Sequence, residues 1–312
     1  MSRAPNASVG GQAVLEGVMM RAPNRWAVAV RRPDGVIEAV AHELPRLSSR
    51  SRWARIPFFR GVMVLVESLQ LGFRALSWSA QKSGEEDEEL TRGQVWLTMA
   101  FAIVFALVLF VGAPVVAADF LKRFLNDSSI GFVIIDGVIR IVLIVGYIWA
   151  ISRAKEIQRV FEYHGAEHMT IHAYESGDPL TLDAISGYSP RHPRCGTSFI
   201  IIVALVAFFV FLLLAPLAFV WQVVARIVMI PVIAGASYEV LKAAAGKKWM
   251  AFASKPGMWL QAITTRQPDS GQIEVAVASL LAALTEEERH DVDERGPVVA
   301  GALEVEYSPE SI

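Results

Sequence analysis

The sequence has little cysteine and little net charge, and both shortages narrow the class of protein. Cys195 is the single cysteine among 312 residues, which excludes an intramolecular disulfide framework. It is therefore a lone thiol, a small buried residue or a metal ligand. The net charge of −2 gives no overall field that would indicate nucleic acid as a partner. The first twenty residues lack the long apolar segment of a secretory signal, so membrane entry would depend on internal segments.

Apolar residues, by contrast, are abundant and clustered. They make up 54% of the chain against 19% charged residues, and the mean hydropathy is +0.41. This composition is typical of a membrane protein rather than of a soluble one with a large core. We expect a mainly α-helical, polytopic membrane protein with four transmembrane helices. Their ranges are 95–118, 130–151, 198–220 and a weaker fourth, 223–244, which contains Pro231 and Gly235.

The N-terminal part has a different pattern. Residues 9–44 alternate like β structure around Pro33-Asp34-Gly35, which predicts a small N-terminal β-hairpin module. Residues 56–78 carry Arg60, Glu67 and Arg74 at seven-residue intervals on one helical stripe, which favours an interfacial amphipathic helix. Between them lies a basic and aromatic stretch, for which a lipid surface is favoured over RNA. Its arginines are Arg46, Arg50, Arg52 and Arg55.

Lysine and arginine predict the orientation of the membrane helices. Thirteen precede the first span, and they are frequent again in residues 152–197 and after the fourth span. By the positive-inside rule, both termini and the 152–197 loop are cytoplasmic, in a multi-pass protein of the cell membrane. The expected divisions are 1–55 (β-rich), 56–93 (amphipathic helix and acidic linker), 94–245 (membrane core), 246–290 (interfacial and amphipathic helices) and 291–312 (flexible tail).

Residues 161–175, "FEYHGAEHMTIHAYE", concentrate the residues that carry chemistry. On a helix His164, Glu167, His168 and His172 share one face. The spelling H-x-x-E-H is that of inverted zinc proteases, in which two histidines hold the ion and the glutamate takes a proton from water. The alternative is the solvated polar face of a helix at the membrane surface, without a metal.

A third ligand must come from another segment, leaving one coordination position open. Glu239 at the end of the fourth span and Cys195 just before the third would both lie at the same membrane face. A purely structural zinc site closed by Cys195 is a further alternative. His172, His192 and Glu16 are secondary candidates; Glu16 follows the Gly-Gly-Gln stretch at residues 10–12 and would equally suit an exposed strand position.

Asp136 and Arg140 lie four residues apart inside the second span, where they can pair on one helix face. Such a pair is either a path for ions or protons or a clamp between helices. It underlies a second hypothesis, a transporter or a non-catalytic membrane scaffold. Four spans are few for a transporter, so that hypothesis would require a homo-oligomer.

Several stretches together resemble the YqhQ-like family of bacterial membrane proteins, a domain of unknown function described as predicted metal-dependent enzymes. They are "GGQAVLEGVMMRAP" (10–23), "YHGAEHMTIHAYE" (163–175), "PRCGTSF" (193–199), "GASYEVLK" (235–242) and "QAITTRQPDSGQIEVA" (261–276). The resemblance implies a bacterial inner-membrane protein that binds a metal. It does not indicate a substrate. The residues predict a zinc-dependent membrane enzyme, a hydrolase acting at the cytoplasmic membrane face, with lipids as partners and no nucleic acid.

Overall fold

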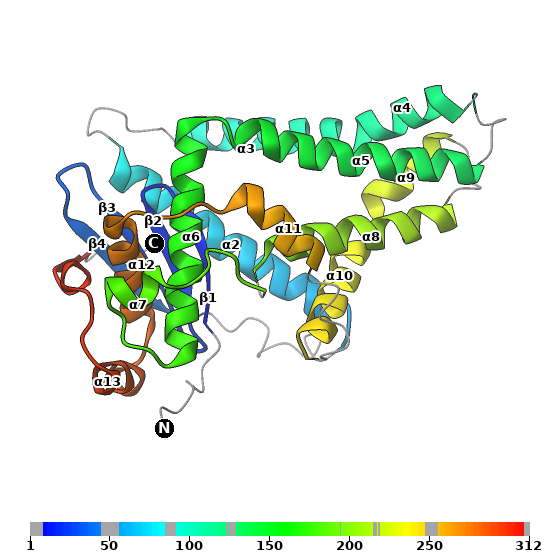
Figure 1. Cartoon of the computed structure of the whole chain (residues 1–312). Helices are drawn as coiled ribbons and strands as arrows, with labels where there is room; N and C mark the ends of the chain where they lie inside the picture. The colour runs from blue at the N-terminus through cyan, green and yellow to red at the C-terminus, as the bar shows by residue number, and fades with distance from the viewer. Residues whose placement is uncertain are drawn as a thin grey trace.

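The computed structural model describes residues 9–44, 56–84, 92–122, 124, 129–193, 195–214, 217, 219–246 and 255–308. A β-sheet with its covering helices forms one side of the molecule, and long apolar helices extend from it to the right in Figure 1. The chain is mainly helical with an N-terminal sheet, as the sequence predicts. The predicted arginine-rich stretch 46–55 and the linker 85–90 lie outside the described residues.

The sheet contains more strands than the predicted hairpin. Four antiparallel strands follow one another: β1 (Gly10–Val14), β2 (Gly17–Arg21), β3 (Arg25–Arg31) and β4 (Ile37–Glu43). The predicted turn at Pro33-Asp34-Gly35 joins the last two, with Gly35 at φ 88°. A fifth strand, β5 (Val305–Tyr307), pairs parallel with β4. The N-terminal module is therefore completed by the C-terminus.

Helices cover both faces of this sheet. Alanines 27 and 29 of β3 pack toward α6 (Lys155–Ser176) and α12 (Ser270–Ala283). The alternate residues Trp26, Val28 and Val30 pack against α2 (Phe59–Ser83). Because both faces are buried, β3 reads as a continuous apolar run instead of an alternating one. The sheet, α6 and α12 thus share one core.

Helix α2 does not expose the whole charged stripe that the sequence predicts for residues 56–78. Glu67 is buried, 3.6 Å from the Arg21 guanidinium of β2, and Arg60 pairs with Glu239 of α10 at 2.5 Å. The exposed face is instead apolar, with Val66, Leu69, Phe73 and Leu76. Arg60 and Glu67 turn inward because α10 and the sheet supply their partners, whereas Arg74 is exposed beside the apolar residues.

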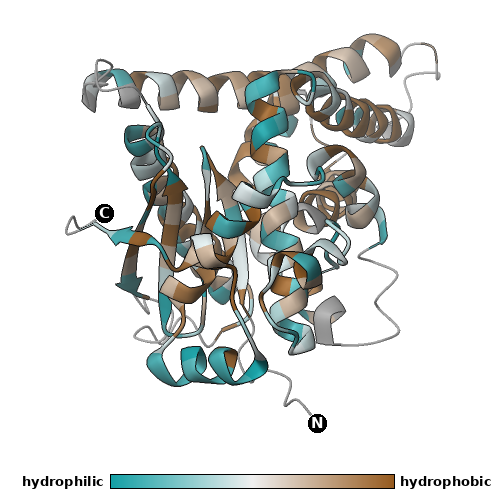
Figure 2. Cartoon of the chain, turned by 60° about the vertical axis from the view of Figure 1, so that its left-hand side comes forward, coloured by the Kyte–Doolittle hydropathy of each residue, from teal (hydrophilic) through white to brown (hydrophobic). Residues whose placement is uncertain are grey.

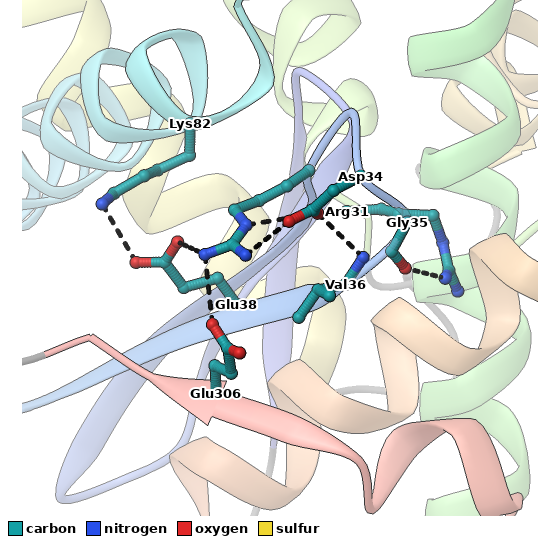
Figure 3. Close-up of polar contacts among 8 residues, drawn as sticks. Arg31, Asp34, Gly35, Val36, Glu38, Lys82 and Glu306 are labelled. Atoms are coloured by element: carbon teal, nitrogen blue, oxygen red, sulfur yellow. Dashed lines mark hydrogen bonds and ion pairs between the residues drawn. The ribbon is translucent and has the colours of Figure 1, made fainter. Parts of the chain in front are cut away.

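A network of charges fixes the far end of α2 to the sheet (Figure 3). Glu38 of β4 is buried between Lys82, at 3.0 Å, and Arg32, at 3.3 Å. Arg32 also binds Asp34 at 2.6 Å and Glu306 of β5 at 3.1 Å. The Glu38 carboxylate and the Arg32 guanidinium therefore connect α2, the β3–β4 turn and the C-terminal strand.

The C-terminal segment is more ordered than the predicted flexible tail. Helix α13 (Glu286–Arg295) begins with a capping box formed by Thr285 and Glu288, and a short 3-10 helix η5 (Ala300–Ala302) precedes β5. Val292, Val299 and Ala302 are buried in the core of the sheet. These isolated apolar residues give no periodic pattern, which explains why the sequence favoured a loose tail.

Two of the apolar helical stretches are long and apolar enough to be membrane spans. Helix α3 (Arg92–Leu107), the π-helical turn η2 (Val108–Gly112) and α4 (Ala113–Lys122) are continuous, and Leu97–Leu121 is long and apolar enough to cross a bilayer. The same holds for Gly131–Ile151 of α5 (Ser129–Ile151). Figure 2 shows hydrophobic residues along these long helices at the top of the view.

The other two predicted spans are less simple. Helix α8 (Thr197–Leu214) is apolar over Phe199–Leu214, which at 1.5 Å per residue falls short of a hydrocarbon core about 30 Å thick. Helices α9 (Phe219–Val228) and α10 (Ile230–Gly246) are bent by 50° at their junction and together form a broken span or a re-entrant loop. By length and composition the described helices thus supply two spans, or three with the bent pair, where the sequence predicts four.

Candidate metal centre

Helix α6 carries the histidine motif and ends at Gly177, which adopts the left-handed conformation at φ 79°. Two neighbouring segments run alongside it. One is α11 (Lys255–Thr264) with the residues that follow; the other is the chain from α7 (Leu182–Ser186) to α8. The close approach of the first segment requires Gly165, because a Cβ there would lie 1.9 Å from the carbonyl oxygen of Arg266.

Both motif histidines bind backbone carbonyls through the same ring nitrogen. Nδ1 of His164 lies 2.8 Å from the Thr264 oxygen, and Nδ1 of His168 lies 2.7 Å from the Pro190 oxygen. A carbonyl only accepts, so each Nδ1 carries the proton and each Nε2 presents a lone pair. Second-sphere bonds of this kind orient histidine ligands in metalloproteins.

Cys195 completes the group. Its Sγ lies 3.2 Å from Nε2 of His164, and one ligand atom from each of His164, His168 and Cys195 lies within 4.8 Å of the others. The preceding loop is clamped by the buried Gln261 of α11, whose side chain accepts from the His192 N–H and donates to the His192 carbonyl. Three segments of the chain therefore hold the three side chains in place: α6, α11 with the residues after it, and the chain between α7 and α8.

This set of side chains fits a metal ion. Nε2 of His168 is buried and has no hydrogen-bond partner among the described residues. An unpaired buried polar atom is costly unless a ligand satisfies it. Burial also lowers the pKa of His168, which keeps the imidazole neutral as metal binding requires. Two imidazoles and one thiolate are ligands that zinc prefers, and three protein ligands leave one position open.

Glu167 lies beside this group without belonging to it. Its Oε2 is 3.9 Å from Nε2 of His164 and 3.7 Å from Nε2 of His168. The carboxylate is buried, and Gly11 of β1 lies close to it, since a Cβ built at Gly11 would lie 2.9 Å from Oε1 of Glu167. Burial raises the pKa of Glu167. A carboxyl group with a raised pKa, next to two lone pairs that could hold a metal, is suited to proton transfer.

The other predicted site residues have different partners. The Glu239 carboxylate binds Arg60, and Glu16 binds Arg159 through both carboxylate oxygens. His172 approaches the Arg191 carbonyl through Nε2 at 3.1 Å, and Nε2 of His192 lies 3.5 Å from Glu175. None of these four belongs to the described group of ligand atoms that could hold one ion.

Sequence reasoning missed the residues that support this centre. Gln261, the Thr264 and Pro190 carbonyls and Gly165 act only through tertiary contacts, so no spacing along the chain reveals them. Gly11 had one visible signal, the paired glycines before an apolar strand. A Cβ at Gly11 would lie 2.7 Å from Cγ of Glu167, so glycine is required for this strand to reach the carboxylate.

We expect Gly165→Ala to weaken metal binding by displacing the Thr264 carbonyl from His164. The added methyl group would meet the Arg266 carbonyl at 1.9 Å, and backbone cannot yield as a flexible side chain does. The loss of stability should be about 1–3 kcal/mol, the usual cost of overpacking. Thermal unfolding and zinc titration measure both effects. Gly10→Ala is the matched control, because a Cβ there meets nothing within 4 Å, and an equal loss in that variant would contradict the explanation.

A second polar cluster lies among the apolar helices and is larger than the predicted ion pair. Asp136 binds Arg140 at 3.4 Å and Arg226 of α9 at 2.6 Å. Arg140 also donates to the Phe110 carbonyl in the π-helical turn η2 at 2.7 Å, and both guanidiniums pack on the Phe211 ring. The cluster joins α5, α8, α9 and η2, which is the arrangement expected of a clamp between helices.

Two comparisons place the chain among known proteins. Residues 56–286 match a family model described as a protein of unknown function (DUF1385). The uncharacterized protein YqhQ of Bacillus subtilis (strain 168) is 35% identical over 293 residues, which cover 86% of this chain and 90% of that protein. No solved structure matches the chain.

Proposed function

The chain belongs to the DUF1385 family of proteins of unknown function, and we propose that it is a metal-dependent hydrolase working at the membrane surface. The convergence of His164, His168 and Cys195 beside a buried glutamate is the observation that carries this proposal. The two imidazoles would bind zinc through Nε2 and Cys195 through its thiolate. Bound in such a set, zinc supplies a Lewis acid that polarises a carbonyl group and acidifies water.

Glu167 performs the proton transfers. Its carboxylate takes a proton from the attacking water as the water oxygen bonds to the substrate carbonyl carbon. The same proton then passes to the leaving nitrogen or oxygen as the carbon–heteroatom bond breaks, which leaves a carboxylic acid and an amine or alcohol. The close approach of Gly11 confines the carboxylate, and the burial of Glu167 raises its pKa, which strengthens the carboxylate as a base.

The site works next to a bilayer in this proposal. In this proposal Leu97–Leu121 and Gly131–Ile151 cross the membrane, and the shorter helix α8 and the bent pair α9–α10 enter it without each forming a full span. The lysine and arginine distribution supports cytoplasmic termini and a cytoplasmic histidine helix. The exposed apolar face of α2 would rest in the lipid interface, because it continues the hydrophobic surface of α10. Substrates are then membrane-proximal.

Glu167→Gln is the test of catalysis. The purified protein in lipid nanodiscs, loaded with zinc, should hydrolyse fluorogenic peptide or ester probes, and the variant should lose about 100-fold or more of that rate. Its zinc content should stay near that of the unaltered chain, since Glu167 is not in the ligand group. Glu156→Gln, on the exposed first turn of the same helix, is the matched control and should retain the rate.

Two results would contradict the proposal. The first is a Glu167→Gln variant as active as the Glu156→Gln control. The second is a fully zinc-loaded protein that hydrolyses neither probe above its Glu167→Gln variant. The second result would favour a structural metal in a membrane scaffold or transporter.

A further inference from the structure

Strand β1 lies at the edge of the sheet, and the backbone hydrogen bonds of its neighbour β2 show which groups of β1 face outward. Arg31 donates to the Glu16 carbonyl and Ala22 donates to the Arg25 carbonyl, so the even-numbered residues of β2 bond to β3. The odd-numbered residues of β2 therefore bond to β1, where their partners are Gly10, Gln12 and Val14. The backbone groups of Gly11 and Ala13 point away from the sheet.

This outer edge is open in the described part of the chain. Residues 10–12 are exposed, and no described strand pairs with β1 on that side. A Cβ at Gly10 would meet nothing within 4 Å. An edge with free N–H and C=O groups is a template for another extended chain unless something blunts it. Neither proline nor lysine stands in β1 to do so.

The same edge borders the metal centre. Gly11 lies against the Glu167 side chain, because a Cβ built at Gly11 would lie 2.9 Å from Oε1 of Glu167. Oε2 of Glu167 in turn lies within 3.9 Å of Nε2 of both His164 and His168. The Gly11 carbonyl and the N–H and carbonyl of Ala13 face outward along this edge. A chain lying along β1 would therefore pass beside Glu167.

We infer that the substrate is an extended polypeptide segment, which binds as an added strand along the outer edge of β1. This rests on the proposed hydrolase and names its substrate class. Alternating donors and acceptors repeated every second residue complement another peptide backbone, whereas a lipid ester offers no such row. The segment donates to the carbonyls of Gly11 and Ala13 and accepts from the Ala13 N–H, and its following peptide group is presented to Glu167.

The test uses the full chain carrying Glu167→Gln, loaded with zinc, so that the probe is not consumed. The probe is a short fluorescein-labelled peptide of alternating threonine and valine with lysines at both ends. Ala13→Pro removes an outward N–H without breaking a bond to β2, and proline is tolerated at such edges. It should weaken binding about tenfold, the value of one or two hydrogen bonds. Ala13→Val keeps the N–H and should bind within about twofold of the parent.

A second measurement does not depend on that variant folding. In the chain without the Ala13 substitution, saturating peptide should slow hydrogen exchange of the Ala13 amide about tenfold and leave that of Gln12, already bonded to β2, unchanged. Failure of the peptide to bind, or an Ala13 amide that exchanges equally with and without it, overturns the inference. A zinc-loaded protein with an unprotected Ala13 would leave the hydrolase standing. Protection that persists in His164→Ala/His168→Ala, which lacks the metal, would support the edge site independently of catalysis.

Discussion

His168→Ala is expected to abolish stoichiometric metal binding. The unaltered chain, purified without a histidine tag, should carry about one zinc per molecule. The variant loses a ligand whose buried Nε2 has no other described partner, and its zinc affinity should fall by about 100-fold or more, beyond the loss typical of second-sphere changes. Elemental analysis and competition with a chromophoric chelator measure stoichiometry and affinity.

Matched variants sharpen this result. His290→Ala removes an exposed histidine on α13 and should retain the metal. Cys195→Ser should lose zinc nearly as completely as His168→Ala, whereas Glu239→Gln should retain it because Glu239 binds Arg60. Retention of zinc by Cys195→Ser with loss in Glu239→Gln would reverse the assignment of the third ligand.

Asp136→Asn is expected to destabilise the helical part of the molecule by roughly 3–5 kcal/mol, the cost of removing one partner from a buried ion pair. Asp136 is the carboxylate that holds both Arg140 and Arg226, and all three side chains are largely buried. The variant would leave two guanidiniums facing each other without compensation. Thermal unfolding in detergent or nanodiscs, followed by circular dichroism, measures the effect.

A variant without the charges of this cluster distinguishes a structural clamp between helices from a path for ions or protons. Asp136→Leu/Arg140→Met/Arg226→Met removes every charge of the cluster and should recover most of the lost stability, as replacement of buried ion pairs by apolar residues often does. Full retention of enzymatic rate in this triple variant fits a clamp. An Asp136→Asn variant as stable as the unaltered chain would contradict the clamp.

The histidine motif was predictable because helix geometry is local. His164, Glu167 and His168 share a face whatever the rest of the chain does, and the structure keeps them together. The choice between Cys195 and Glu239 was not predictable. The topology expected from the sequence places both at one membrane face, but it does not reveal that Arg60 of α2 binds the Glu239 carboxylate. That partner depends on how α2 crosses α10.

The fold shows the same division between local and long-range information. The apolar stretches and the Pro33-Asp34-Gly35 turn follow from composition and turn chemistry, and both are present. Pairing of β5 with β4 joins residues far apart in sequence through a strand of only three residues, which is too short to show a period. Arg226 was overlooked because it stands alone in an apolar segment, and its partner Asp136 lies on another helix.

Zinc K-edge X-ray absorption of the purified protein tests the central claim most directly. The account predicts about one zinc per chain, two imidazole nitrogens at about 2.0–2.1 Å and one sulfur at about 2.3 Å, the ordinary bond lengths for these ligands. The sulfur scatterer should disappear in Cys195→Ser. A protein without stoichiometric zinc under zinc-replete growth, or a spectrum with zinc bound by oxygen and nitrogen alone, would contradict a metal centre built from His164, His168 and Cys195.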